Sequence, residues 1–235
     1  MRNLITIILG LLIISCAKEK QYDLTVKGTI KNLKKGTIYL QKIKDSTLVN
    51  VDSMVINVQK EFLLHSNLNS PEVFYLHLNK TNEDSQRKIP FFADKGITEI
   101  NATLKDFPFK HTIKGSSQQE KYTEFKNMIT QFNNKNIDII KAQLEAQVSG
   151  DTAEANAKTK EVNNLLKSKY RYAINFAINN KDSEVAPYIA LSEIYDTNIT
   201  YLDTIYKSLP KHIASSKYGV ELDKFIKQRK EEDNQ

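Results

Sequence analysis

The sequence predicts an α+β protein in which a β-rich half, residues 22–115, precedes an all-helical half, residues 116–230. In the first half, apolar and polar residues alternate over short runs that turn-forming clusters separate, a pattern typical of antiparallel strands. In the second half, apolar residues recur at steps of three and four, as on amphipathic helices. With 235 residues, 40% of them hydrophobic, the chain can bury a core of ordinary size. We therefore expect an antiparallel β-sandwich followed by a helical hairpin and short helices.

The chain begins with a short apolar segment, residues 1–15, which we interpret as an export signal. Arg2 gives a positively charged start, and the eleven residues from Leu4 to Ile14 are almost wholly apolar. As a helix, eleven residues extend roughly 16 Å, about half of the roughly 30 Å of hydrocarbon in a membrane. This length favours a cleaved signal over a membrane span.

Cys16 is the only cysteine, and it directly follows Ile13-Ile14-Ser15. A cysteine at this position is typical of bacterial lipoproteins and predicts a lipid on residue 16, with residues 16–21 as the tether. The alternative is an ordinary signal with an unrelated, buried cysteine. The residue after Cys16 is Ala17 and no aspartate follows, which favours the outer membrane, with the protein facing the periplasm or the cell surface. An acylated Cys16 would leave no thiol for disulfide exchange.

The β-rich half predicts eight strands. Residues 24–30 and 38–40 alternate on either side of a break at Lys34-Lys35-Gly36, and we expect them to form the first hairpin. Pro90 has no backbone N–H, so its strand is expected at a sheet edge or to begin at the proline. The six further predicted strands cover residues 48–58, 61–65, 73–78, 89–93, 97–102 and 111–113.

The helical half contains two capping patterns. Ser116 or Ser117, followed by Gln119 or Glu120, predicts the start of a helix of about eight turns that ends at Gly150. A second capping pattern begins at Asp151, and the two long helices are expected to pack as a hairpin. Three shorter helices are predicted at residues 183–195, 199–209 and 216–229, and residues 231–235 are expected to form a polar tail.

Several short segments follow one another in the order seen in a known family. They include Val26-Lys27-Gly28-Thr29-Ile30, Gly36-Thr37-Ile38-Tyr39-Leu40, Ile89-Pro90-Phe91-Phe92, Gly96-Ile97-Thr98-Glu99-Ile100 and Ile113-Lys114-Gly115-Ser116. Over residues 22–229 the chain resembles the domain-of-unknown-function family that forms the N-terminal part of lipoprotein thiol:disulfide oxidoreductases. In that family an AhpC/TSA thioredoxin-like domain with a Cys-x-x-Cys motif follows, whereas this sequence ends at Gln235.

The resemblance implies a recognition or spacer module without catalytic residues of its own. We therefore favour a non-catalytic, lipid-anchored binding module for a small ligand or a partner protein, without a cofactor. The first alternative is an accessory to a separate thioredoxin-like protein that docks on residues 216–229. The second alternative is an unrecognised hydrolase, which would need a deep pocket holding a histidine and a carboxylate. The oligomeric state stays open.

Aromatic side chains supply the candidate binding surface, because the chain has eleven tyrosines. Packing in the core is the competing interpretation for all of them. A groove between helices is a further possibility for Tyr170, Tyr172, Tyr188 and Tyr195. The candidate surface residues on the sheet and the last helix are Tyr39, Tyr75, Phe91, Phe92, Tyr218 and Phe225.

Other site chemistry is weakly indicated. The pair Asp52-Ser53 resembles a nucleophile beside an acid, but no glycine elbow surrounds it, so a hydrogen bond at a strand end is favoured. The net charge of +6 is small and unclustered, which argues against nucleic-acid binding. The four histidines, His65, His77, His111 and His212, lie far apart in sequence, and solvated or hydrogen-bonded positions are favoured for them. A metal site would require the strands of His65, His77 and His111 to be neighbours in the sheet.

Overall fold

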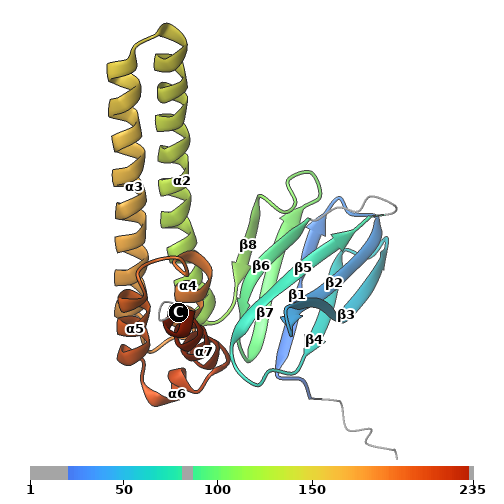
Figure 1. The fold of residues 1–235 in the computed structure, drawn as a ribbon. Coiled ribbons are helices and arrows are strands. Elements are labelled where there is room, and N and C mark those ends of the chain that lie inside the picture. The colour runs from blue at the N-terminus through green and yellow to red at the C-terminus, as the bar shows by residue number, and fades with distance from the viewer. Residues whose placement is uncertain (1–20, 81–86, 233–235) are drawn as a thin grey trace, which may run out of the picture.

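The computed structural model describes residues 21–80 and 87–232, and within them a β-sandwich is followed by a helical domain (Figure 1). This confirms the predicted fold class. The predicted signal, the lipid-bearing Cys16 and the end of the polar tail lie outside the described residues.

Two four-stranded sheets form the sandwich, with strand orders β4-β1-β7-β8 and β3-β2-β5-β6. All eight predicted strands are present within a few residues of their expected bounds. The strands are β1 (Leu24–Lys31), β2 (Lys35–Lys44), β3 (Thr47–Asn57), β4 (Glu61–Ser66), β5 (Glu72–Asn79), β6 (Lys88–Ala93), β7 (Gly96–Thr103) and β8 (His111–Lys114). Strand β6 lies at a sheet edge, as Pro90 predicted.

The predicted first hairpin is wrong, because β1 and β2 belong to different sheets. Between them Asn32 turns the chain with a φ of 69°, and the buried side chain of Leu33 joins the core between the sheets. The hairpin that does form joins β2 to β3 through Asp45 and Ser46, whose φ values are 48° and 62°. Positive φ at both central residues is the twist that a two-residue hairpin requires. Strand β1 pairs parallel to β7, so its sheet is mixed.

Both predicted N-caps of the long hairpin are confirmed. Helix α2 (Ser117–Ser149) begins at Ser116, whose hydroxyl accepts a hydrogen bond from the Gln119 N–H. Gly150 ends the helix in the left-handed conformation with φ 79°. Asp151 then caps α3 (Thr152–Asn179) by accepting from the Glu154 N–H at 2.9 Å. At 33 residues, α2 is about 50 Å long, and the tip of the hairpin projects beyond the rest of the protein (Figure 1).

Shorter helices surround the base of this hairpin (Figure 1). They are α4 (Val185–Glu193), α5 (Ile199–Ser208), α6 (Lys211–Ala214) and α7 (Lys217–Glu232). Helix α6 was not predicted, and α7 continues three residues beyond the expected end at Arg229. None of the helices in the described ranges is long and apolar enough to cross a membrane.

The helical domain joins the sandwich at the edge strand β6. Successive side chains of a strand point to opposite faces, so Phe91 enters the sandwich core while Phe92 enters the helical core. Both are 0% exposed, which corrects the expectation that they line an accessible surface. The backbone N–H of Phe92 donates to Gln119 Oε1 of α2 at 2.6 Å, so a helix side chain completes the hydrogen bonding at this sheet edge.

Candidate functional site

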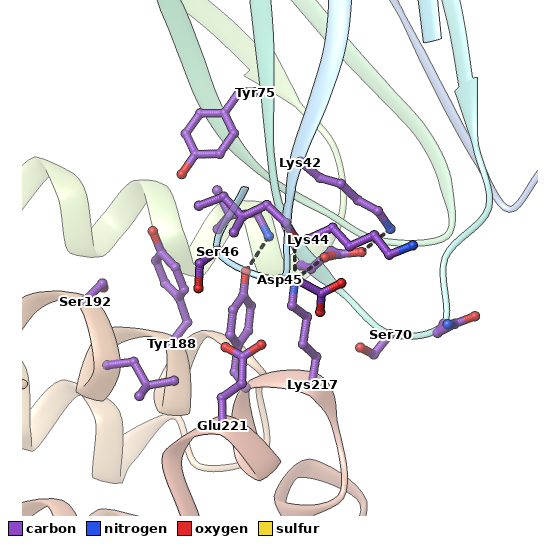
Figure 2. A pocket seen from close by; sticks show the side chains of 16 residues that line it. Lys42, Lys44, Asp45, Ser46, Ser70, Tyr75, Tyr188, Ser192, Lys217 and Glu221 are labelled. Carbon is purple, nitrogen blue, oxygen red and sulfur yellow. Dashed lines mark hydrogen bonds and ion pairs between the residues drawn. The ribbon is translucent and has the colours of Figure 1, made fainter. Parts of the chain in front are cut away.

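A cavity of about 800 Å³ lies where the sandwich meets the helical domain (Figure 2). We call it the junction cavity. Four separate segments line it: the end of β2 with its turn, the start of β5, helix α4 and the start of α7. Its charged and aromatic lining residues are Lys42, Lys44, Asp45, Glu72, Tyr75, Tyr188, Lys217, Tyr218 and Glu221.

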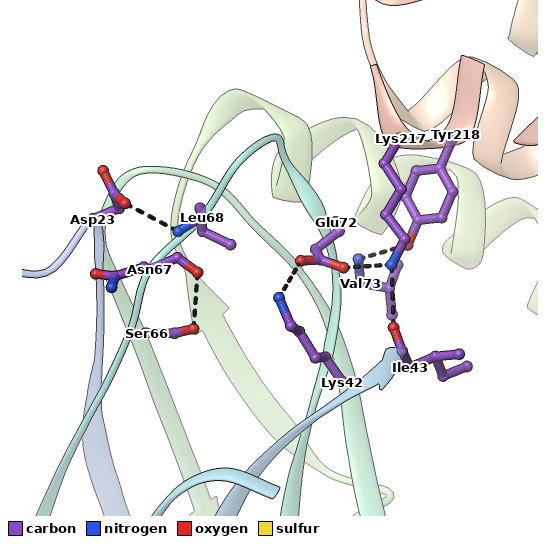
Figure 3. A network of polar contacts seen from close by, with 10 residues as sticks. All are labelled: Asp23, Lys42, Ile43, Ser66, Asn67, Leu68, Glu72, Val73, Lys217 and Tyr218. Carbon is purple, nitrogen blue, oxygen red and sulfur yellow. Dashed lines mark hydrogen bonds and ion pairs between the residues drawn. The ribbon is translucent and has the colours of Figure 1, made fainter. Parts of the chain in front are cut away.

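A buried carboxylate joins the two domains beside this cavity (Figure 3). Glu72 is 5% exposed, and its Oε1 accepts from Lys42 Nζ at 2.8 Å. Its Oε2 accepts from Lys217 Nζ at the start of α7. The same ammonium group donates to the backbone oxygen of Ile43 at 3.2 Å. A carboxylate this deeply buried needs such partners. Both lysines are therefore held by Glu72, and their ammonium groups are largely occupied by this ion pairing.

Tyrosine side chains form the apolar wall of the cavity. Tyr218 accepts a hydrogen bond from the Val73 N–H at 2.9 Å through its hydroxyl oxygen, and its ring lies 5.0 Å from that of Tyr188. Burial raises the pKa of Tyr218, and it also raises the pKa of Tyr75 and Tyr188. The three phenols therefore stay protonated at neutral pH, as neutral hydrogen-bonding groups.

Several polar groups of the cavity remain available to a ligand. Within the described residues, the Tyr75 hydroxyl, the Glu221 carboxylate and the Lys44 ammonium group form no direct hydrogen bond or ion pair. Burial raises the pKa of Glu221, nearby Lys217 lowers it in part, and Glu72 raises it further. Through these three side chains the cavity offers a hydrogen-bond donor, an acidic group and a cation, and Asp45 adds a second carboxylate.

We expect replacement of Glu221 by glutamine to raise the melting temperature at pH 7 and to leave it nearly unchanged below pH 4. A carboxyl group with a raised pKa in the folded state stabilises the fold below its usual pKa of 4.5 and loses that contribution as the pH rises through the folded value. Glutamine resembles the protonated form at every pH. Thermal unfolding between pH 3.5 and 8 measures the difference, with exposed Glu145→Gln as the control. An equal shift at both ends of this range would contradict the prediction.

The structure brings some of the predicted surface residues together and separates others. Tyr75 and Tyr218 both line the junction cavity, and Tyr188 joins them. Tyr39 lies elsewhere on β2 and stacks on His77 with ring centroids 5.9 Å apart. Phe225 is half-buried against the helical core.

The predicted groove of four helix tyrosines does not form as one site. The Tyr170 hydroxyl donates to Asp196, and Tyr172 stacks on Phe125 at 5.9 Å, while Tyr188 lies in the junction cavity. The charged residues of the cavity were missed because they have no common spacing in the sequence. The only signal was Glu72, a carboxylate at the start of an otherwise apolar strand.

The histidines do not converge. His65 lies on β4 and His111 on β8, at opposite edges of one sheet, while His77 lies on β5 of the other sheet. In residues 21–80 and 87–232, no group of three histidine, cysteine, aspartate or glutamate side chains could hold a metal ion.

Asp52 lies within β3 and not at the strand end that the sequence favoured, but it does bond main-chain groups. Its two oxygens accept from the backbone N–H groups of Ser53 and His65 at 2.8 and 2.7 Å. A second cavity, of about 330 Å³, contains both Asp52 and His65. However, the imidazole stacks on Tyr22 at 4.7 Å, and the carboxylate binds the main chain of residue 65. Asp52 therefore does not orient this imidazole as the acid of a catalytic triad would.

These features define a two-part protein in which a β-sandwich carries a helical domain docked on one sheet edge. Residues 24–122 match the model of a family described as a domain of unknown function, DUF4369. The match covers the whole sandwich and the first residues of α2, and it confirms the resemblance for this region. A comparison with curated proteins gave no match.

Proposed function

We propose that the protein is a non-catalytic binding module of the cell envelope and that the junction cavity receives a small polar ligand. The observation that supports this is the set of available groups around that cavity. Glu221 can accept a hydrogen bond or pair with an amine, Tyr75 can donate, and Lys44 can pair with an anion. A small molecule with both an amine and an acidic group fits this chemistry, and the rings of Tyr188 and Tyr218 can pack against its apolar part.

The proposed ligand can be sought directly by native mass spectrometry of the protein purified in mild detergent from its own membranes. Ser192 lines the cavity with an exposed side chain, so Ser192→Trp is expected to fill the space without disturbing the core. Ser168 is exposed on α3, away from the cavity, and Ser168→Trp is the matched control. We expect a defined mass increment on the wild type and on the control, and none on Ser192→Trp. Wild-type protein without any bound small molecule would contradict this ligand role.

A lipid on Cys16 is part of the proposal. The described chain leaves the sandwich at the end opposite the tip of the long hairpin (Figure 1). An anchor at residue 16 would therefore hold the end of the sandwich at the outer membrane, with the hairpin directed away from it.

Replacement of Cys16 by alanine is expected to move the protein from the membrane fraction to the soluble fraction, because thioether attachment of the lipid needs the thiol. Cell fractionation followed by immunoblotting measures this, and Ala17→Ser is the control that keeps the cysteine. Retention of the Cys16→Ala variant in the membrane fraction would contradict lipid attachment at Cys16. Mild crosslinking of the anchored form tests the alternative that the protein is an accessory to a separate thioredoxin-like protein. Recovery of a Cys-x-x-Cys protein would favour this accessory role over an independent binding module.

A further inference from the structure

At three of the four sheet edges, side chains of the protein itself bond outward-facing backbone groups. At the edge of β4, Asp52 and Met54 accept from the backbone N–H groups of His65 and Leu63. At the edge of β3, the amide of Gln59 bonds the backbone of both Asn57 and Val55 at 2.7 Å. At the edge of β6, the Gln119 side chain accepts from the Phe92 N–H. Such contacts protect a sheet edge from pairing with another chain.

Strand β8 is the fourth edge, and it has no such cover. In an antiparallel pair alternate residues turn their N–H and C=O groups away from the neighbouring strand, so two of the four residues of β8 face outward. Among the described residues, no side chain or helix backbone bonds these outward groups. The His111 ring bonds only the Pro108 oxygen in its own loop, at 2.7 Å.

A groove of about 530 Å³ runs along this open edge, between β8 and the first turns of α2. His111, Thr112 and Ile113 form one wall. Phe109, which also lines the groove, is 89% exposed, an unusual position for a phenylalanine. The opposite wall consists of polar side chains from one face of α2, namely Thr123, Lys126, Asn127 and Thr130.

The groove favours negative charge. Its lining includes Lys126 and His111 and no aspartate or glutamate. Lys110 and Lys114, at the two ends of β8, are exposed as well. Lys126 pairs with Glu193 of α4 at 3.6 Å, but both side chains are partly exposed, so this pair is weak and leaves the ammonium group accessible.

We propose that an extended, acidic segment of a partner protein adds to β8 as a further strand, within the groove beside α2. Main-chain hydrogen bonds to β8 would supply the common part of the affinity, as in other cases of strand addition. Acidic side chains of the segment would face Lys126 and the lysines at the ends of β8, and an apolar side chain would cover Phe109. This site is separate from the junction cavity and does not depend on the ligand proposed there.

A synthetic peptide of four Glu-Val repeats, acetylated at its N-terminus and amidated at its C-terminus, tests the site. It is titrated into isotopically labelled protein that lacks the first fifteen residues and carries Cys16→Ala. We expect saturable NMR shifts confined to β8, the Phe109 loop and the first turns of α2. Two further peptides carry N-methyl groups, one on every Glu nitrogen and one on every Val nitrogen. Since only one edge of an added strand faces β8, one of them is expected to lose binding and the other to keep it.

Charge variants complete the test. Lys126→Glu is expected to weaken binding of the acidic peptide about tenfold and to permit binding of a peptide of Lys-Val repeats. Lys141→Glu, on the exposed distal part of the same helix, is the matched control and is expected to change neither affinity. The proposal is overturned by an absence of saturable shifts, by equal binding of both N-methylated peptides, or by shifts centred elsewhere. Concentration-dependent pairing of β8 between two copies of the chain would overturn it in favour of a self-association edge.

Discussion

Replacement of Phe92 by alanine is expected to reduce the free energy of unfolding by about 3–5 kcal/mol. The ring is 0% exposed and makes edge-on contacts with Tyr122, Tyr188 and Tyr218, with centroids 5.7–6.0 Å apart. These three tyrosines come from α2, α4 and α7, so the phenylalanine is a side chain of the sandwich on which three helices meet. Equilibrium unfolding in urea, followed by circular dichroism, measures the loss.

Phe109→Ala is the matched control because it deletes the same ring at an exposed position. We expect it to change the unfolding free energy by no more than about 0.5 kcal/mol. The Phe92 variant should also lose ligand from the junction cavity, since Tyr188 and Tyr218 form its wall. Two variants of equal stability would show that the helical domain does not depend on this contact.

The elements of the fold were predictable because their signals are local. Ser116 and Asp151 cap their helices through N–H groups three residues away, and Gly150 ends α2 at the position that its sequence indicated. Pro90 likewise placed its strand at an edge, since it lacks an N–H. Each of these depends on a residue and its immediate neighbours.

The arrangement of the elements was not predictable from the same signals. Strand β1 pairs with β4 and β7, and no residue near Lys34 or Gly36 specifies that β2 will join the other sheet. The alternation of β6 required that Phe91 and Phe92 face opposite ways, but not that a second core would bury Phe92. Which faces are covered depends on elements far along the chain.

The junction cavity was hidden for the same reason. Lys217 meets Glu72 from 145 positions away, and Tyr218 meets Val73 across the same separation. Sequence analysis identified Tyr75 and Tyr218 as aromatic candidates but had no means of placing them with Glu221 and Lys44. Long-range ion pairs between single residues leave no spacing pattern in one sequence.

Replacement of Gly219 by alanine is expected to reduce the free energy of unfolding by about 3 kcal/mol or more, through overpacking against main-chain atoms. An added Cβ would lie 2.1 Å from the Ile213 oxygen and 2.6 Å from the Ala214 oxygen. Backbone carbonyl groups cannot rotate away as a flexible side chain does, so α7 would have to move from α6. Thermal and urea unfolding measure the effect, and Val220→Ala, at the next and 56% exposed position, is the control expected to stay within about 0.5 kcal/mol.

The same substitution tests how the cavity is held. Lys217 and Tyr218 precede Gly219 directly, so a displaced α7 carries the Glu72 ion pair and the Val73 hydrogen bond with it. We therefore expect Gly219→Ala to lose both stability and the proposed ligand, whereas Ser192→Trp loses the ligand alone. If Gly219→Ala kept wild-type stability, the close crossing of α6 and α7 would not be what fixes this side of the cavity.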